Sequence, residues 1–160
     1  MFVLPEGLPL ELTPLAFLAG KWSGSGVISY SKPGSDEPPV EHEFLQTVEF
    51  SYTDANYLNY VSQVRLADGT DASPPTELGF WRISRPAEDA DHGPGFILGT
   101  GEPLLKTHED LEKLRNKEGG FDINVSTLHP GGVAELYNGK IKGARIDLAS
   151  AQGVAFEGAK

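Results

Sequence analysis

Residues 20–26 read GKWSGSG, a stretch in which glycines surround a single tryptophan. If this stretch is an extended strand, Trp22, Gly24 and Gly26 share one face, so a large ring stands beside a nearly bare strip of backbone. Glycine permits a sharp bend and the close approach of another backbone or of a ligand. Two interpretations are open: Trp22 closes one end of a barrel, or Gly24 and Gly26 leave room for a ligand beside it.

Apolar and polar residues alternate at period two along most of the chain, which predicts about eight short strands. We expect strands at residues 22–30, 42–51, 56–66, 76–83, 121–128, 133–138 and 145–149, with 154–156 beginning another and 96–98 forming a further short one. Turns are expected at 32–39, 68–69, 130–132 and 138–139. Such a pattern favours a barrel or a sandwich. Because closure removes edge strands, we expect an all-β, antiparallel up-and-down barrel of the lipocalin or fatty-acid-binding-protein type.

One helix is expected on the surface of that barrel, at residues 107–117. Thr107 can cap it and Asp110 lies at the capping-box spacing, while Gly119-Gly120 ends it. This helix belongs to an insertion, residues 84–120, that is rich in Pro, Asp and Gly in its first half. The insertion is either a lid over a barrel mouth or a surface segment without a role in chemistry, and we expect the second.

The chain has 160 residues, of which 23 are acidic and 13 basic, so its formal net charge is −10. This length fits a single domain over residues 1–160. The acidic balance argues against nucleic acid and against an anionic membrane surface as partners. Cysteine is absent, which excludes disulfides and thiolate chemistry. Residues 1–20 do not read as a signal peptide or a membrane span, so we expect a cytoplasmic protein.

Several motifs together resemble the nitrobindins, a family of small haem-binding barrels. The GxWxGxG pattern at 20–26 is similar to the signature of that family, and TELGFWR at 76–82 resembles its E-x-G-aromatic-aromatic-R strand. Residues 121–137, which contain HPGGVAELY, resemble the paired strands that follow in the family. RIDLAS at 145–150 resembles the family's next strand. The likeness covers roughly residues 10–83 and 120–156 and is fairly specific when these motifs are taken together.

The resemblance implies a barrel pocket that holds haem b, with ferric iron bound by one histidine and its other face open to small ligands such as nitric oxide. It also implies the isomerisation of peroxynitrite to nitrate, in which the iron acts as a Lewis acid. Carried onto this sequence, Trp22, Gly24, Gly26 and Thr76 are expected to line the cofactor pocket. His129, which ends a predicted strand, is the best candidate among the four histidines to touch a pocket ligand.

Two departures from the family pattern concern the haem. The axial histidine of the family lies near its C-terminus, after a proline, and no matching segment precedes Lys160. We therefore assign no metal ligand and expect the closing C-terminal strands to be absent. Some relatives carry a histidine before the E-x-G strand, where this chain has Pro74-Pro75. The alternative function is a haem-free, lipocalin-like module that binds an apolar small molecule. The sequence leaves open whether the protein forms a homodimer.

Overall fold

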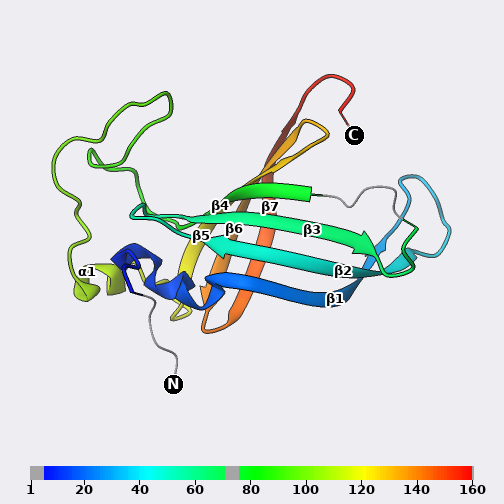
Figure 1. Cartoon of the computed structure of the whole chain (residues 1–160), viewed down its shortest axis with the longest axis horizontal. Helices are drawn as coiled ribbons and strands as arrows, with labels where there is room; N and C mark the ends of the chain where they lie inside the picture. Colours follow the sequence, from blue (N-terminus) through cyan, green and yellow to red (C-terminus); the bar gives the residue numbers. More distant parts are fainter. Residues whose placement is uncertain (1–5, 71–75, 160) are drawn as a thin grey trace.

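The computed structural model describes residues 6–70 and 76–159. Within them, seven strands form one antiparallel sheet in which each strand pairs with the next along the chain (Figure 1). The strands are β1 (Gly20–Tyr30), β2 (Val40–Ser51), β3 (Leu58–Leu66), β4 (Thr76–Ile83), β5 (Phe121–His129), β6 (Val133–Lys142) and β7 (Arg145–Ala155). Two short helices accompany them, the 3-10 helix η1 (Leu10–Leu18) and α1 (His108–Glu112). The expected all-β antiparallel fold is confirmed.

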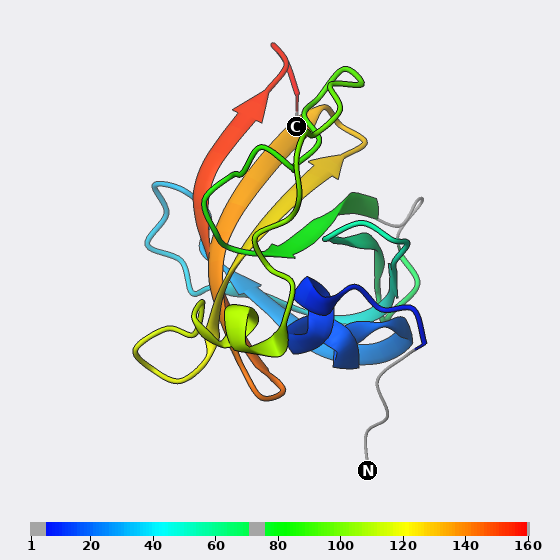
Figure 2. The ribbon, with the colours of Figure 1, turned by 90° about the vertical axis from the view of Figure 1, so that its left-hand side faces the viewer.

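The sheet curls into a half-barrel, with a concave face inside and a convex face outside (Figure 2). Side chains alternate between the two faces along each strand. The register places the even-numbered residues of β1, β2 and β3 on the concave face, together with the odd-numbered residues of β4, β5 and β6. Among the described residues, β1 and β7 are the two edges of the sheet and do not pair with each other.

The helix η1 packs against one end of the concave face and closes it. Leu12 and Leu15 are fully buried there, and the Trp22 indole Nε1 donates a hydrogen bond of 2.8 Å to the Leu18 carbonyl, which ties β1 to the helix. The sequence did not predict η1, because Pro14 interrupts it and no side chain caps its start. Its leucines join the core, which also contains Phe50, Leu58, Tyr60, Trp81, Ile83, Leu111, Phe121, Ile123, Val125 and Ile141.

The C-terminal strands are longer than expected. The turn predicted at Asn138-Gly139 is wrong, because Gly139 lies inside β6 and pairs with Leu148 of β7. A Cβ at Gly139 would overlap the Leu148 side chain, so glycine serves there for close packing rather than for a turn. Residues 154–156 do not begin a separate strand, since β7 runs through to Ala155. Because 96–98 forms no strand either, the described residues contain seven strands instead of about eight.

The insertion is also simpler than expected. Residues 96–98 form no strand, and the helix ends at Glu112 instead of continuing to 117. Its predicted start is correct, since Thr107 and Asp110 form a capping box. Beyond it, the Asn116 side chain accepts hydrogen bonds from the backbone N–H of Glu118 and of Gly120, which competes with helix formation.

A buried cluster of charges holds the first part of the insertion against η1. Arg85 donates to both carboxylate oxygens of Glu11, at 2.9 and 3.2 Å, and to both of Asp91, at 2.8 and 2.7 Å. Its guanidinium also lies 3.5 Å from a carboxylate oxygen of Glu88. Because Glu11 belongs to η1, this cluster fastens the insertion at the end of the half-barrel that η1 closes, where Figure 1 shows the insertion, η1 and α1 together.

Candidate functional site

A continuous row of polar side chains crosses the concave face beyond the core. His129 stands at its centre, with Nε2 lying 3.0 Å from Glu135 Oε2 and 3.8 Å from Glu77 Oε2. Each carboxylate is held in turn by a tyrosine: the Tyr60 hydroxyl donates to Glu77 at 2.5 Å, and the Tyr137 hydroxyl donates to Glu135 at 2.8 Å. These five residues come from β3, β4, β5 and β6 and form what we call the Tyr-Glu-His-Glu-Tyr row.

The environment of the row keeps both tyrosines neutral. Burial and the hydrogen bond to Glu77 raise the pKa of Tyr60 far above its ordinary value. Burial and the hydrogen bond to Glu135 raise the pKa of Tyr137 to about 12. A phenol that donates to a carboxylate resists losing its proton, because ionisation would place two negative charges side by side. Both hydroxyls therefore remain fixed donors across the physiological pH range.

The row borders the apolar core under η1, to which Tyr60 itself belongs. Several large apolar side chains of the concave face stay exposed. Trp22, Ile28 and Tyr30 of β1 are 51%, 49% and 49% exposed, and Leu148 of β7 is 41% exposed. The concave positions of the described strands carry no Lys or Arg. The concave face thus combines exposed apolar side chains with a polar row that contains two carboxylates.

The glycines of the first motif shape the concave face of β1. A Cβ at Gly24 would meet nothing within 4 Å, so the space beside Trp22 is open. A Cβ at Gly26 would lie 2.7 Å from the Phe44 ring of the neighbouring strand, so that glycine makes room for the ring. Gly24 therefore leaves the bare strip that the sequence suggested, whereas Gly26 is used by packing within the protein.

The family-model comparison matches residues 11–160 to the THAP4-like, heme-binding beta-barrel domain. The chain belongs to this family. It is also 46% identical over 162 residues to a protein of Clavibacter michiganensis subsp. michiganensis named peroxynitrite isomerase, covering 100% of this chain and 79% of that protein. A peroxynitrite isomerase of Leifsonia xyli subsp. xyli is 44% identical over 160 residues, with 100% and 79% covered.

A solved structure supports the same fold. Rv2717c from M. tuberculosis matches with a TM-score of 0.55 and 22% identity, over 99% of this chain and 74% of that one. The expected resemblance to the haem-binding barrel family is confirmed by these comparisons. In the structure, the E-x-G-aromatic-aromatic-R stretch supplies Glu77 to the row, Gly79 to a close strand contact, and Trp81 to the core.

The structure brings most of the sequence-predicted site residues to one face, but not all. Trp22, Gly24 and Gly26 on β1 and His129 on β5 occupy concave positions. Thr76 pairs with Gln63 at the start of β4, and alternation places it on the convex face. Pro74 and Pro75 lie outside the described residues.

Four residues of the row were missed by the sequence interpretation: Tyr60, Glu77, Glu135 and Tyr137. A signal was available, because Glu77 and Glu135 share the parity of buried residues on their strands, which is unusual for a carboxylate. Glu77 and Glu135 are held by partners on neighbouring strands. A single sequence does not show which residues pair across the sheet, so these contacts could not be predicted.

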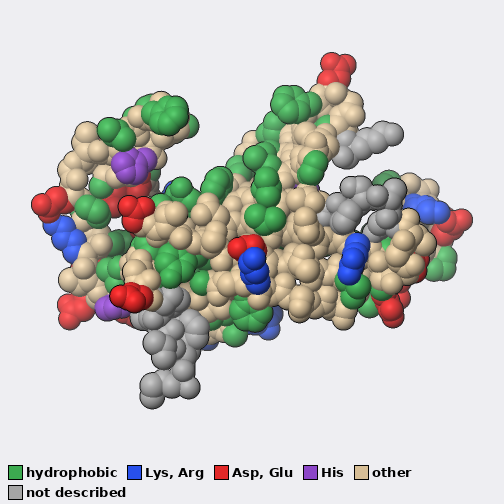
Figure 3. All heavy atoms as spheres, viewed as in Figure 1, with side chains coloured by type: hydrophobic (Ala, Val, Ile, Leu, Met, Phe, Trp, Pro, Cys, Tyr) green, Lys and Arg blue, Asp and Glu red, His purple; other side chains and the backbone are tan. Residues whose placement is uncertain are grey.

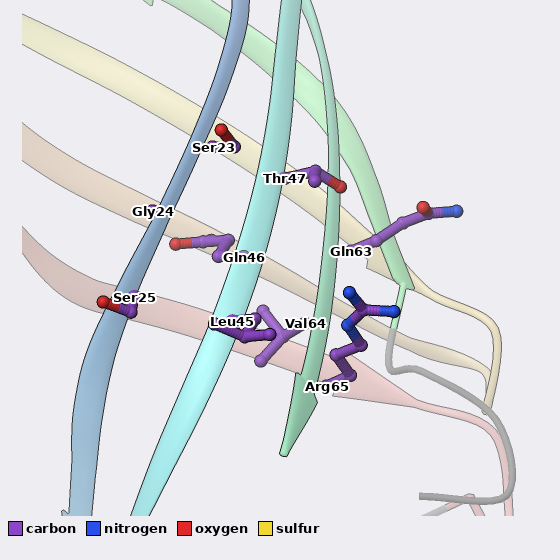
Figure 4. A pocket seen from close by; sticks show the side chains of 9 residues that line it. All are labelled: Ser23, Gly24, Ser25, Leu45, Gln46, Thr47, Gln63, Val64 and Arg65. Carbon is purple, nitrogen blue, oxygen red and sulfur yellow. The ribbon is translucent and has the colours of Figure 1, made fainter. Parts of the chain in front are cut away.

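A hollow of about 480 Å³ lies across β1, β2 and β3, and Figure 4 shows the nine residues around it. Most of them, such as Ser23, Thr47 and Arg65, occupy convex positions, so this hollow lies on the face opposite the Tyr-Glu-His-Glu-Tyr row. Among the described residues no group of three or more His, Asp or Glu side chains is arranged to hold a metal ion. No described helix has both the length and the apolar character needed to cross a membrane.

Proposed function

We propose that the concave face of the half-barrel binds haem b, and that the ferric haem protein interacts with nitric oxide or isomerises peroxynitrite to nitrate. The observation that carries the proposal is the concave face itself, which exposes apolar side chains and is open beside Gly24. The match to a haem-binding barrel family and the peroxynitrite isomerases among its relatives support it. A cytoplasmic location stays a prediction.

The residues of the concave face fit a large, flat, apolar group. Trp22 and Ile28 present half-exposed apolar surface on this face, and covering such surface is favourable by roughly 25 cal/mol per Å². Gly24 leaves the backbone of β1 accessible to the edge of a ring system. When bound, ferric haem would supply a Lewis-acidic iron toward an anion such as peroxynitrite.

The Tyr-Glu-His-Glu-Tyr row would influence how a haem lies against the concave face. Glu77 and Glu135 are carboxylates, so they disfavour the approach of the carboxylate side groups of a haem and favour burial of its apolar face instead. The two carboxylates also orient the His129 ring. This arrangement resembles the carboxylate–histidine pairs that support bound metals, but it occupies His129 Nε2. We therefore assign no iron ligand among the described residues.

Hemin titration tests the proposal. We expect the wild-type chain to develop a Soret band at a stoichiometry of one, and Gly24→Leu, which fills the open space, to weaken binding at least about tenfold. Ser25→Leu is the matched control, since Ser25 is the next residue on the same strand but points to the convex face, and its affinity should be unchanged. Absence of both a Soret band and a saturable titration would refute haem binding.

Two further measurements separate the activities from the alternative. Stopped-flow decay of peroxynitrite should accelerate in proportion to the bound ferric haem, and nitrate should be the product. Native mass spectrometry of protein purified from cells should show haem. A co-purified lipid or another apolar molecule in its place would support the haem-free binding module.

A further inference from the structure

Two polar atoms on the concave face are buried without a hydrogen-bond partner among the described residues. They are Nε1 of the Trp81 indole and the hydroxyl Oγ1 of Thr127, and these two residues are only 7% and 4% exposed. Folded proteins pair nearly all of their buried polar groups, because an unpaired group loses its hydrogen bonds to solvent and gains none in return. The two atoms therefore indicate a bound group that is not part of the protein chain.

The register of the sheet places the two residues close together. Thr127 of β5 lies opposite Gly79 of β4, and Trp81 is the next residue after Gly79 on the concave side of β4. Diagonal neighbours on one face of a sheet are within reach of an aromatic side chain. Gly79 has no side chain and cannot serve as a partner for either atom. One bound group can therefore contact both Trp81 and Thr127.

The Tyr-Glu-His-Glu-Tyr row runs around this position. Tyr60 lies opposite Gly79 on β3, and the centroid of its ring is 5.7 Å from that of the Trp81 ring. Glu135 lies opposite Thr127 on β6. The hydrogen bonds of Glu135 within the row go to Oε2, so its Oε1 can accept a further one. Polar groups of the row thus lie on both sides of Trp81 and Thr127.

We propose that one water molecule is bound between Trp81 Nε1 and Thr127 Oγ1 and connects them to the row. The indole N–H can only donate, so the bound atom must accept a hydrogen bond, which excludes a metal cation. Glu77 and Glu135 disfavour an anion, and no concave position of the described strands carries Lys or Arg. The charged side chains visible in Figure 3 lie mostly toward the two ends of the molecule.

Water has both capacities that this position requires. It accepts from the Trp81 N–H, and it donates to Thr127 Oγ1 or to Glu135 Oε1. Buried waters typically make about three hydrogen bonds to groups that would otherwise stay unpaired. The bound water therefore joins Trp81, a core residue, to the hydrogen-bonded network of His129. It helps to fix the polar part of the concave face before any ligand binds.

Nuclear magnetic resonance of the isotope-labelled 160-residue chain tests the site directly. The chain has two tryptophans, so it gives two indole N–H signals, which a Trp22→Phe variant assigns. We expect the Trp81 N–H to show cross-relaxation with a water molecule that stays bound for longer than the protein takes to tumble. Trp22 is the internal control, because its Nε1 donates to the Leu18 carbonyl and its half-exposed ring meets rapidly exchanging water. A Trp81 signal without that water contact would overturn the proposal.

A substitution at Thr127 tests the site through stability. Thr127→Val keeps the shape of the side chain and removes the hydroxyl. Because the bound water loses a partner, the unfolding equilibrium constant measured in urea should rise about fivefold, and the contact between Trp81 and water should weaken. Removing a hydroxyl that has no partner would instead lower this constant.

Thr47→Val is the matched control, because Thr47 is exposed on the convex face of β2. It should change the unfolding equilibrium constant by less than about twofold. A Thr127→Val protein that is at least as stable as the wild type would contradict a bound water at this position.

Discussion

Replacing Arg85 with methionine should destabilise the protein strongly although Arg85 lies far from the concave cavity. The Arg85 side chain is only 5% exposed, and it is the shared partner of Glu11, Asp91 and Glu88, whose side chains are 9%, 18% and 9% exposed. Methionine keeps most of the apolar stem but removes every donor. Three largely buried carboxylates would then lie together without their cation.

The expected magnitude follows from those burial values. Removing one partner of a buried ion pair costs about 3–5 kcal/mol, because the remaining charge stays desolvated. Since Asp91 and the insertion can shift toward water, we expect the lower end, about 3 kcal/mol. For a domain of this size that corresponds to a fall in Tm of roughly 6–12 °C.

Urea unfolding monitored by tryptophan fluorescence, together with a thermal scan, measures this loss. Arg145→Met is the matched control: Arg145 also binds both oxygens of an acid, Asp147, at 2.9 Å each, but the two side chains are 79% and 60% exposed. It should leave Tm unchanged. If the free energy of unfolding of Arg85→Met lies within about 1 kcal/mol of the wild-type value, the buried charges do not hold the insertion against η1.

Three further predictions concern charge and close packing. Arg85 lowers the pKa of Asp91 in the folded state. The stabilisation from this ion pair is therefore complete above the unfolded pKa of about 3.9 and is lost as pH falls below it. The wild type should lose more stability than Arg85→Met between about pH 5 and pH 3, and parallel plots of unfolding free energy against pH would contradict this. Gly79→Ala places a Cβ onto the Ser126 carbonyl oxygen and should cost at least about 2 kcal/mol in urea unfolding, whereas Gly24→Ala, which meets nothing within 4 Å, should cost less than about 1 kcal/mol. Tyr137 should ionise near pH 12 in an ultraviolet titration, and Glu135→Gln should bring that ionisation to lower pH; an unchanged titration would show that Glu135 does not bind the phenol.

Sequence patterning located the strands well because alternation is a local property. Thr76–Ile83 was predicted with the observed bounds, and the capping box at Thr107 was read from spacing alone. The errors arose where tertiary contacts override local signals. Asn138-Gly139 reads as a turn, yet Gly139 is needed where Leu148 packs closely. In the same way η1 has no capping signal and exists because its leucines fill the closed end of the half-barrel.

The candidate site was only partly readable for a related reason. Trp22 and Gly24 form a local motif, so their shared face followed from alternation. The row depends on Glu77, His129 and Glu135 meeting across three strands, and that meeting is set by register. A single sequence specifies which face a residue takes but not which residue lies beside it on the next strand. The alternation of apolar and polar residues therefore could not predict the partners of Glu77, His129 and Glu135 on neighbouring strands.

Stability and the proposed ligand binding use different parts of the same concave face. Under η1, Leu12, Leu15 and Leu58 are fully buried, so this end is packed without any ligand. Toward the end of β1, Ile28 and Tyr30 remain half exposed and contribute little to the core. The ligand-free chain should therefore stay folded, and a ligand should raise Tm only by mass action, increasing with the logarithm of its free concentration. Both carboxylates of the row have hydrogen-bond partners within the row, so the row needs no ligand to satisfy them.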